Sequence, residues 1–130
     1  MIELYIDGAS AGDSGWSGAG IFLKIHGSVK QYAIPIGLKD NHEAEYIALI
    51  KGLQICLEQK ITSVSVRTDS QAVVSAIEKE YAKNEKYRLL LDEALALSKQ
   101  FDLFFIKWIP SKQNKNADAL AKKAIMLNDY

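Results

Sequence analysis

The chain has 130 residues, 48% hydrophobic and 25% charged, a composition ordinary for one globular domain spanning residues 1–130. No apolar run approaches the roughly 20 residues of a membrane span and no segment resembles a signal peptide, so we expect a cytosolic protein without membrane contact. The 16 basic and 16 acidic residues balance, which argues against a protein that binds nucleic acid through its overall charge.

Three strands are predicted in the first third of the chain. Residues 2–7 alternate apolar and polar side chains, the pattern of a strand with one buried face. The glycine-rich segment 8–18 is typical of a loop, and strands are expected over residues 19–25 and 29–36 with a turn between them. Pro35 near the end of the third strand indicates an edge position, because proline has no N–H to donate to a neighbouring strand.

Helices and two further strands are predicted in the rest of the chain. Asp40 or Asn41 can cap the first of these helices, and Pro110 stops the last strand. We expect helices over residues 41–57, from Asp69-Ser70 onward, over residues 85–100 and after Asn114 or Asn116, with strands over residues 61–67 and 103–108. Cys56, the single cysteine, lies in an apolar helical pattern and is expected to be a buried, inert thiol.

This order of elements, βββαβααβα, predicts an α/β fold. Short connections should join the first three strands as an antiparallel meander. Helical crossovers should make the third, fourth and fifth strands parallel. Placing the fourth strand beside the first gives a five-stranded mixed sheet in the order 3-2-1-4-5, with helices on both faces.

Four acidic residues interrupt the pattern where an element ends or a helix begins: Asp7, Glu45, Asp69 and Asp118. Asp7 closes the first strand and Asp69 follows the fourth, so both should project from the carboxyl edge, where open α/β sheets bind ligands. Each acid also has an ordinary structural explanation, as a turn residue, a helix cap or a partner of a helix dipole. Their joint placement at one edge favours a shared site.

Such a site would bind divalent cations. Carboxylates held together repel each other and raise each other's pKa, and bound cations remove that penalty. Two metal ions about 4 Å apart can activate a water and stabilise the leaving oxygen in a displacement at phosphorus, which favours a metal-dependent phosphodiesterase. No rival chemistry is supported: Cys56 has no poised partner, His26 and His42 are not spaced as a metal pair, and a Walker loop is absent.

Each of the four acids lies within a longer motif. The motifs are Tyr5-Ile6-Asp7-Gly8-Ala9-Ser10, Asn41-His42-Glu43-Ala44-Glu45-Tyr46, Thr68-Asp69-Ser70-Gln71 and Asn114-Lys115-Asn116-Ala117-Asp118-Ala119-Leu120-Ala121. In this order they resemble the motifs of ribonuclease H type 1, the family that includes the reverse-transcriptase-associated domain. The resemblance covers nearly the whole chain, including the glycine-rich segment and Trp108-Ile109-Pro110.

The resemblance implies a ribonuclease H-like fold and endonucleolytic hydrolysis of the RNA strand of an RNA–DNA hybrid, with 5′-phosphate and 3′-hydroxyl products. It implies two Mg²⁺ ions as cofactors, with Mn²⁺ as a substitute, and a monomeric enzyme is expected. The implied metal ligands and catalytic residues are Asp7, Glu45, Asp69 and Asp118.

Five further residues are expected to contact the nucleic acid. By position in the motifs, Asn41 and Gln71 would read the minor groove, where 2′-hydroxyls distinguish RNA from DNA. Ser10 and Gly12 would approach the RNA backbone. Lys112, in a lysine-rich C-terminal segment, would meet phosphates.

The chain also departs from many members of this family. The loop over residues 111–113 contains no histidine, and residues 80–88 are too short and too mixed in charge to form a basic handle. Two other functions therefore stay open: a module that binds RNA or RNA–DNA hybrids with little catalysis, and another nuclease of the same fold, such as a junction resolvase or exonuclease. The intact set of acids argues against the first, and the motifs around Glu45 and Asp69 argue against the second.

Overall fold

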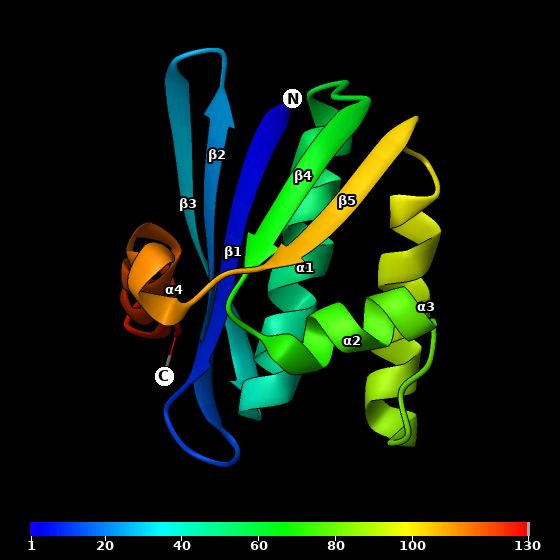
Figure 1. Ribbon diagram of the computed structural model, residues 1–130. Helices are drawn as coiled ribbons and strands as arrows, with labels where there is room; N and C mark the ends of the chain where they lie inside the picture. Colours follow the sequence, from blue (N-terminus) through cyan, green and yellow to red (C-terminus); the bar gives the residue numbers. More distant parts are fainter. Residues whose placement is uncertain (130) are drawn as a thin grey trace.

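A computed structural model describes residues 1–129 as one five-stranded sheet packed between α-helices (Figure 1). The α-helices and strands are β1 (Ile2–Ser10), β2 (Gly15–Ile25), β3 (Ser28–Lys39), α1 (Asn41–Glu58), β4 (Ser63–Thr68), α2 (Gln71–Lys79), α3 (Glu85–Ser98), β5 (Leu103–Trp108) and α4 (Lys115–Ile125). A short 3₁₀ helix, η1 (Ser111–Gln113), links β5 to α4. The predicted order of elements is confirmed.

The sheet has the predicted order β3-β2-β1-β4-β5. Strand β1 pairs antiparallel with β2 and parallel with β4, and β4 pairs parallel with β5. Pro35 lies in β3, at the edge of the sheet, as expected for a residue without an N–H. Because β1, β4 and β5 run the same way, their carboxyl ends meet at one end of the sheet.

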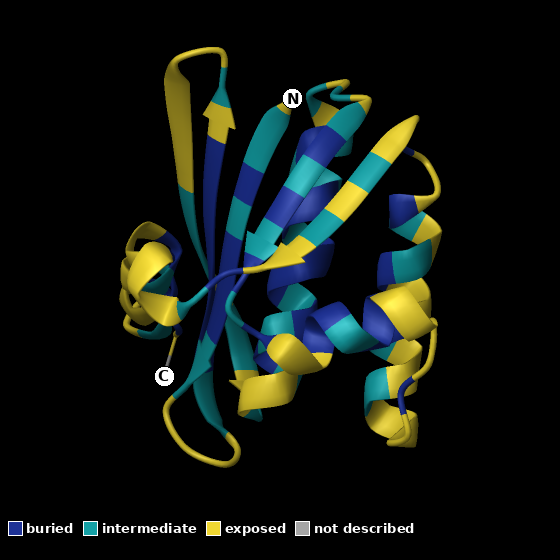
Figure 2. Cartoon of the chain, in the orientation of Figure 1, coloured by how far each residue is buried: buried dark blue, intermediate teal, exposed yellow. Residues whose placement is uncertain are grey.

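Helices cover both faces of the sheet, as predicted. Helix α1 packs on one face with α2 and α3 beside it, and α4 packs on the other face against β1, β2 and β3. The main core lies under α1, where β1 contributes Leu4 and Ile6, while Tyr5 and Asp7 alternate to the opposite face. Figure 2 shows the buried stretches of the central strands and of α1 facing each other. Cys56 is buried there, and burial raises the pKa of its thiol to about 12, which confirms the inert thiol. Within residues 1–129, no helix is both long and apolar enough to span a bilayer.

The glycine-rich segment is mostly strand, so the predicted loop over residues 8–18 is wrong. Only residues 11–14 connect β1 to β2. Most of these glycines permit close packing and do not form turns: a Cβ on Gly8 would lie 2.2 Å from the main chain of Ala44 in α1. A Cβ on Gly20 would lie 2.1 Å from the main-chain oxygen of Ala117 in α4. The missing side chains let two helices approach β1 and β2 closely enough to reach one end of the sheet.

Helix α1 begins at a capping box that the sequence only partly specified. The Asp40 side chain accepts a hydrogen bond from the Glu43 N–H at 2.8 Å, and the Glu43 side chain accepts one from the Asp40 N–H at 2.9 Å. Of the two candidate caps, Asp40 is therefore the one used. Asn41 becomes the exposed first residue of the helix, with its side chain outside the cap.

Candidate metal centre

The four acids predicted from the sequence lie on four elements that converge at the carboxyl end of β1. Asp7 lies within β1, and Asp69 directly follows β4, its parallel neighbour. Glu45 lies in the N-terminal part of α1, which packs on β1, and Asp118 lies in the first turn of α4, which packs on the other face of β1. The expectation that Asp7 closes the first strand is wrong, because β1 continues to Ser10 along β2; the carboxylates come from within β1, from the end of β4 and from two helix N-termini.

Asp7 is the electrostatic centre of this group. Its side chain is buried, with 8% of the residue exposed. Burial, the charges of Asp69, Asp118 and Glu45, and a hydrogen bond shared with Asp118 raise the pKa of Asp7 from 3.8 to about 8, burial contributing most. Asp7 therefore holds a proton at neutral pH unless a cation offsets the neighbouring charges.

Glu45 and Asp118 each have a second partner. Burial raises the pKa of Glu45, while His42 and a hydrogen bond from Ser70 oppose that shift. His42 Nδ1 lies 3.2 Å from Glu45 Oε1. Asp118 forms an ion pair with Lys122 one turn later on α4, at 3.0 Å. A bound cation would compete with these contacts for both acids.

The donor set fits hard divalent cations, although it is not a closed ligand shell. Within residues 1–129, no three side chains of His, Cys, Asp or Glu lie close enough together to hold one ion as they stand. The mutual effect on the pKa of Asp7 nevertheless shows that the four carboxylates share one electrostatic environment. Carboxylates that repel one another stay further apart without a cation than with one. Oxygen-only donors on separate elements match Mg²⁺, which keeps several waters and few protein ligands.

A cluster of polar and aromatic residues connects the acids to α3. Lys86 Nζ and the Tyr87 hydroxyl donate to Asp40 at 2.7 and 3.1 Å, which ties the first turn of α3 to the cap of α1. The Tyr87 ring stacks on Tyr46 and contacts His42 edge to face. His42 therefore joins this cluster to Glu45. The sequence alone gave no sign of the connection, because α1 and α3 are far apart along the chain.

The expected nucleic-acid contacts also lie at this end of the sheet. Asn41 and Gln71 are the exposed first residues of α1 and α2. Asn41 lies one turn before Glu45, and Gln71 lies two residues after Asp69. Ser10 ends β1 and donates a hydrogen bond to the main-chain oxygen of Gly12 at 2.8 Å. Lys112 is exposed in η1, beyond the carboxyl end of β5. The placement is compatible with one continuous surface around the acids.

Asn114 has a structural role that the sequence analysis did not anticipate. It occupies the position before α4 but makes no side-chain capping bond. Its Nδ2 donates instead to the main-chain oxygen of Ile6 at 2.9 Å, across 108 residues of sequence. This bond joins the start of α4 to β1 directly beside Asp7, and so sets where Asp118 lies. The only sequence signal was its spacing four residues before that acid.

The acid cluster predicts an unusual pH dependence of stability for the metal-free protein. Because the folded state binds the Asp7 proton more tightly than the unfolded chain, stability should fall as pH rises from 3.8 towards 8. One such proton contributes up to about 1.4 kcal/mol per pH unit. Thermal melts in EDTA should therefore give a lower melting temperature at pH 8 than at pH 5, and Mg²⁺ should restore stability most at pH 8. Equal melting temperatures at both pH values would contradict the cluster.

The sequence is similar to a reverse transcriptase-like family, to ribonucleases H and to a protein provisionally described as a hydrolase. The family described as Reverse transcriptase-like matches residues 6–124. An Enterococcus faecalis protein, provisionally described as the hydrolase EbsB, is 44% identical over 127 residues, covering 96% of this chain and 94% of its own length. Ribonuclease HI of Halobacterium salinarum is 32% identical over 127 residues, covering 95% of this chain and 64% of its own length.

Solved structures share the whole architecture. The crystal structure of RNase H1 from Halobacterium salinarum superposes with a TM-score of 0.91 at 31% identity, and the match covers 98% of both chains. LC11-RNase H1, isolated from compost by a metagenomic approach and solved in complex with an RNA/DNA hybrid, gives a TM-score of 0.89 at 26% identity over 98% of both chains. The sheet order and the flanking helices are therefore those of an established fold.

Proposed function

This chain belongs to the reverse transcriptase-like family of ribonuclease H-like proteins, and we propose that it hydrolyses the RNA strand of RNA–DNA hybrids. The products would carry 5′-phosphate and 3′-hydroxyl ends. One observation carries the proposal: Asp7 is buried at the carboxyl end of β1 within the field of three further carboxylates. Such an arrangement is costly for stability and is expected where cations are bound for catalysis. The similar structure of LC11-RNase H1, solved in complex with an RNA/DNA hybrid, supports the choice of substrate.

In this proposal the four acids are the ligands of two Mg²⁺ ions. When bound, the ions supply an activated water and stabilise the leaving oxygen of the phosphodiester. Asp7, on the central strand, provides the fixed and buried ligand. Glu45 and Asp118 can turn towards it from helix N-termini by giving up their contacts with His42 and Lys122. Asp69 completes the set from the end of β4.

Substrate recognition is assigned to the exposed residues around the acids. Asn41 and Gln71 present amide side chains that can donate to and accept from 2′-hydroxyls and base edges in a minor groove. Ser10 and Gly12 lie on the β1–β2 connection, and Lys112 offers a cation to a phosphate. We expect a cytosolic enzyme that acts as a monomer on these hybrids.

A single-turnover assay tests the proposal. With enzyme in excess and Mg²⁺ or Mn²⁺ present, a labelled RNA–DNA hybrid should be cut and the matching DNA duplex spared. Multiple turnover should be slow, because η1 offers no histidine to assist proton transfer or product departure. The control is Asp69→Asn, which removes one proposed ligand. Cleavage of DNA duplex at an equal rate would favour a resolvase or exonuclease instead.

The second candidate is a module that binds hybrids without cutting them. It is favoured by the ion pair between Asp118 and Lys122, which neutralises one proposed ligand, and by the absence of a closed ligand shell among residues 1–129. Tight binding of the hybrid with no cleavage above the Asp69→Asn level in either metal would establish this module and exclude the enzyme.

A further inference from the structure

Half of one sheet face carries no helix among the described residues. Helix α4 packs on β1, β2 and β3 only near their glycine-rich ends, and β4 and β5 have no helix on that side. Figure 1 shows this area in front of α1, and Figure 2 colours many residues along β1, β4 and β5 as intermediate or exposed. A bare sheet face of this kind is available to a ligand.

Strand register places basic and aromatic side chains together on this area. Lys107, Arg67, Tyr5 and Phe22 are aligned partners across four neighbouring strands. Phe105 lies two residues before Lys107 on β5, and Lys24 lies two residues after Phe22 on β2, so both are on the same side of the sheet. Phe105 is 51% exposed. We call this area the Tyr5 face and define it by its six residues: Tyr5, Phe22, Lys24, Arg67, Phe105 and Lys107.

The Tyr5 face is basic in a chain of zero net charge. It contains three cations, and one acid lies beside it: Glu3, which pairs with Arg67 at 3.0 Å and lies 4.0 Å from Lys24. Two of the cations flank an aromatic ring: Lys24 Nζ and Arg67 Cζ lie 5.3 and 5.6 Å from the Tyr5 centroid. Positive charge beside aromatic surface suits a ligand that alternates phosphates with flat bases.

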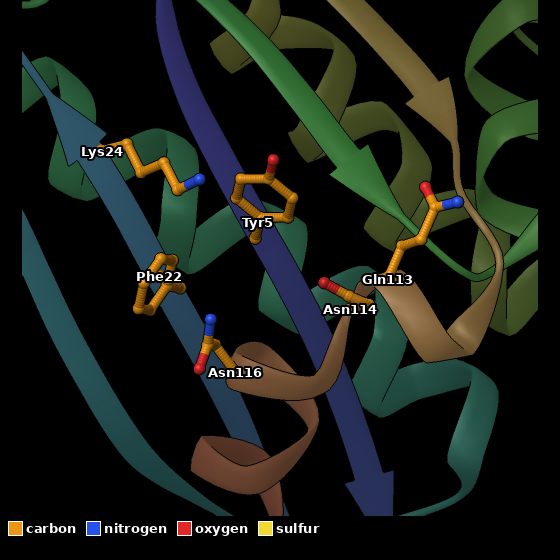
Figure 3. Close-up of a pocket in the computed structure, with 6 residues that line it drawn as sticks. All are labelled: Tyr5, Phe22, Lys24, Gln113, Asn114 and Asn116. Atoms are coloured by element: carbon orange, nitrogen blue, oxygen red, sulfur yellow. The ribbon is translucent and has the colours of Figure 1, made fainter.

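A pocket at one end of this face contains an unpartnered acceptor. Asn114 is 1% exposed, and its Oδ1 has no hydrogen-bond partner. Figure 3 shows this oxygen pointing towards Tyr5, with Phe22, Lys24 and Asn116 around the same pocket. This oxygen can only accept a hydrogen bond, so a ligand in the pocket would have to supply an N–H or O–H donor. The cavity, about 80 Å³, is much smaller than a small-molecule pocket and has room only for a few atoms, such as the edge of a single base.

The Tyr5 face is continuous with the candidate metal centre. Tyr5 precedes Asp7 by two residues on β1, so both side chains lie on the same face of the sheet. Asn114 precedes Asp118 by one turn at the start of α4. The connection from β5 to α4 crosses in front of β1 between the two areas, where Asn114 bonds to Ile6, so a strand that passes the acids reaches the Tyr5 face over this connection (Figure 1).

We propose that the Tyr5 face binds a single-stranded segment of nucleic acid, with phosphates at Lys24, Arg67 and Lys107 and one base edge at the Asn114 pocket. The inference rests on the proposed function, since this segment would be the unpaired flank of a hybrid held at the acids. Exposed aromatic residues on a sheet stack bases in other nucleic-acid-binding folds. The face would favour hybrids with single-stranded extensions over blunt ones.

Binding of labelled single strands in EDTA tests the proposal independently of cleavage. Oligonucleotides of roughly 12 nucleotides, a length within the usual range of single-strand sites, would be made as RNA, as DNA and as an abasic backbone of equal charge. We expect Phe105→Ser and Lys24→Gln each to weaken binding of the base-bearing strands by roughly five-fold or more. Both residues are substantially exposed, so both variants should fold, and melting curves verify this.

The matched control is Lys99→Gln, the same charge change directly after α3 and away from the Tyr5 face, which should leave binding unchanged. Stronger binding of RNA than DNA, or the reverse, would identify which strand flanks the hybrid. Equal binding of the abasic and base-bearing strands, or no effect of Phe105→Ser and Lys24→Gln, would overturn the proposal. Intact single-strand binding without hybrid cleavage would leave this inference standing and sink only the proposed function.

Discussion

Replacement of Asp7 by asparagine should abolish cleavage of an RNA–DNA hybrid and, at the same time, stabilise the metal-free protein. Asparagine keeps the size of the side chain but removes the negative charge that would bind a cation. It also removes a carboxylate whose pKa is raised to about 8 by burial and by three neighbouring acids. At pH 7 this ionisable group costs up to about 4 kcal/mol of folding stability relative to an unperturbed carboxylate, so the metal-free melting temperature should rise.

Two measurements separate the role of Asp7 in catalysis from its role in stability. Melting curves of wild type and Asp7→Asn should differ most at pH 8 in EDTA and converge towards pH 5, where wild-type Asp7 is protonated. Addition of Mg²⁺ should raise the melting temperature of the wild type and have little effect on the variant. Near-normal cleavage by Asp7→Asn in Mg²⁺ would show that the site has been assigned to the wrong residues.

Replacement of Gly20 by alanine should be among the most destabilising single-methyl changes in this chain. The added Cβ would lie 2.1 Å from the Ala117 main-chain oxygen and 2.5 Å from the Ala121 nitrogen, both in α4. Main-chain atoms cannot rotate away, so α4 must move off the sheet. We expect a loss of about 3 kcal/mol or more, and a fall in melting temperature of roughly 10 °C or more. Mg²⁺-dependent stabilisation should weaken with it, because Asp118 moves with α4.

The same substitution at Gly27 provides the control. Gly27 lies in the β2–β3 turn with φ of 82°, and a Cβ there would meet no atom within 4 Å. Gly27→Ala therefore carries only the conformational cost of a positive φ, about 1 to 2 kcal/mol, and should keep its response to Mg²⁺. If the melting temperature of Gly20→Ala were no lower than that of Gly27→Ala, close packing of α4 against β2 would not be the reason for a glycine at position 20.

The sequence by itself determined the elements of the fold and the order of the sheet. Alternation along β1 separated Leu4 and Ile6 from Tyr5 and Asp7, and short and long connections distinguished antiparallel from parallel neighbours. Such patterns are local, because a strand or helix repeats its buried positions every few residues. For the same reason Asp69 could be assigned to a strand end, and Glu45 and Asp118 to helix starts, whereas Asp7 lies within β1, which is longer than predicted.

Only the tertiary structure decided which residues from distant segments of the sequence contact one another. The predicted loop over residues 8–18 proved to be mostly strand, because glycines such as Gly18 allow close packing of a helix that lies about a hundred residues later in the sequence. Contact of His42 with Glu45 and Tyr87, and the bond from Asn114 to Ile6, likewise depend on packing between elements. No periodicity encodes such contacts, since each is fixed by the distance and angle at which whole elements meet. The bare Tyr5 face follows from the same packing, because α4 is placed over only one half of the sheet.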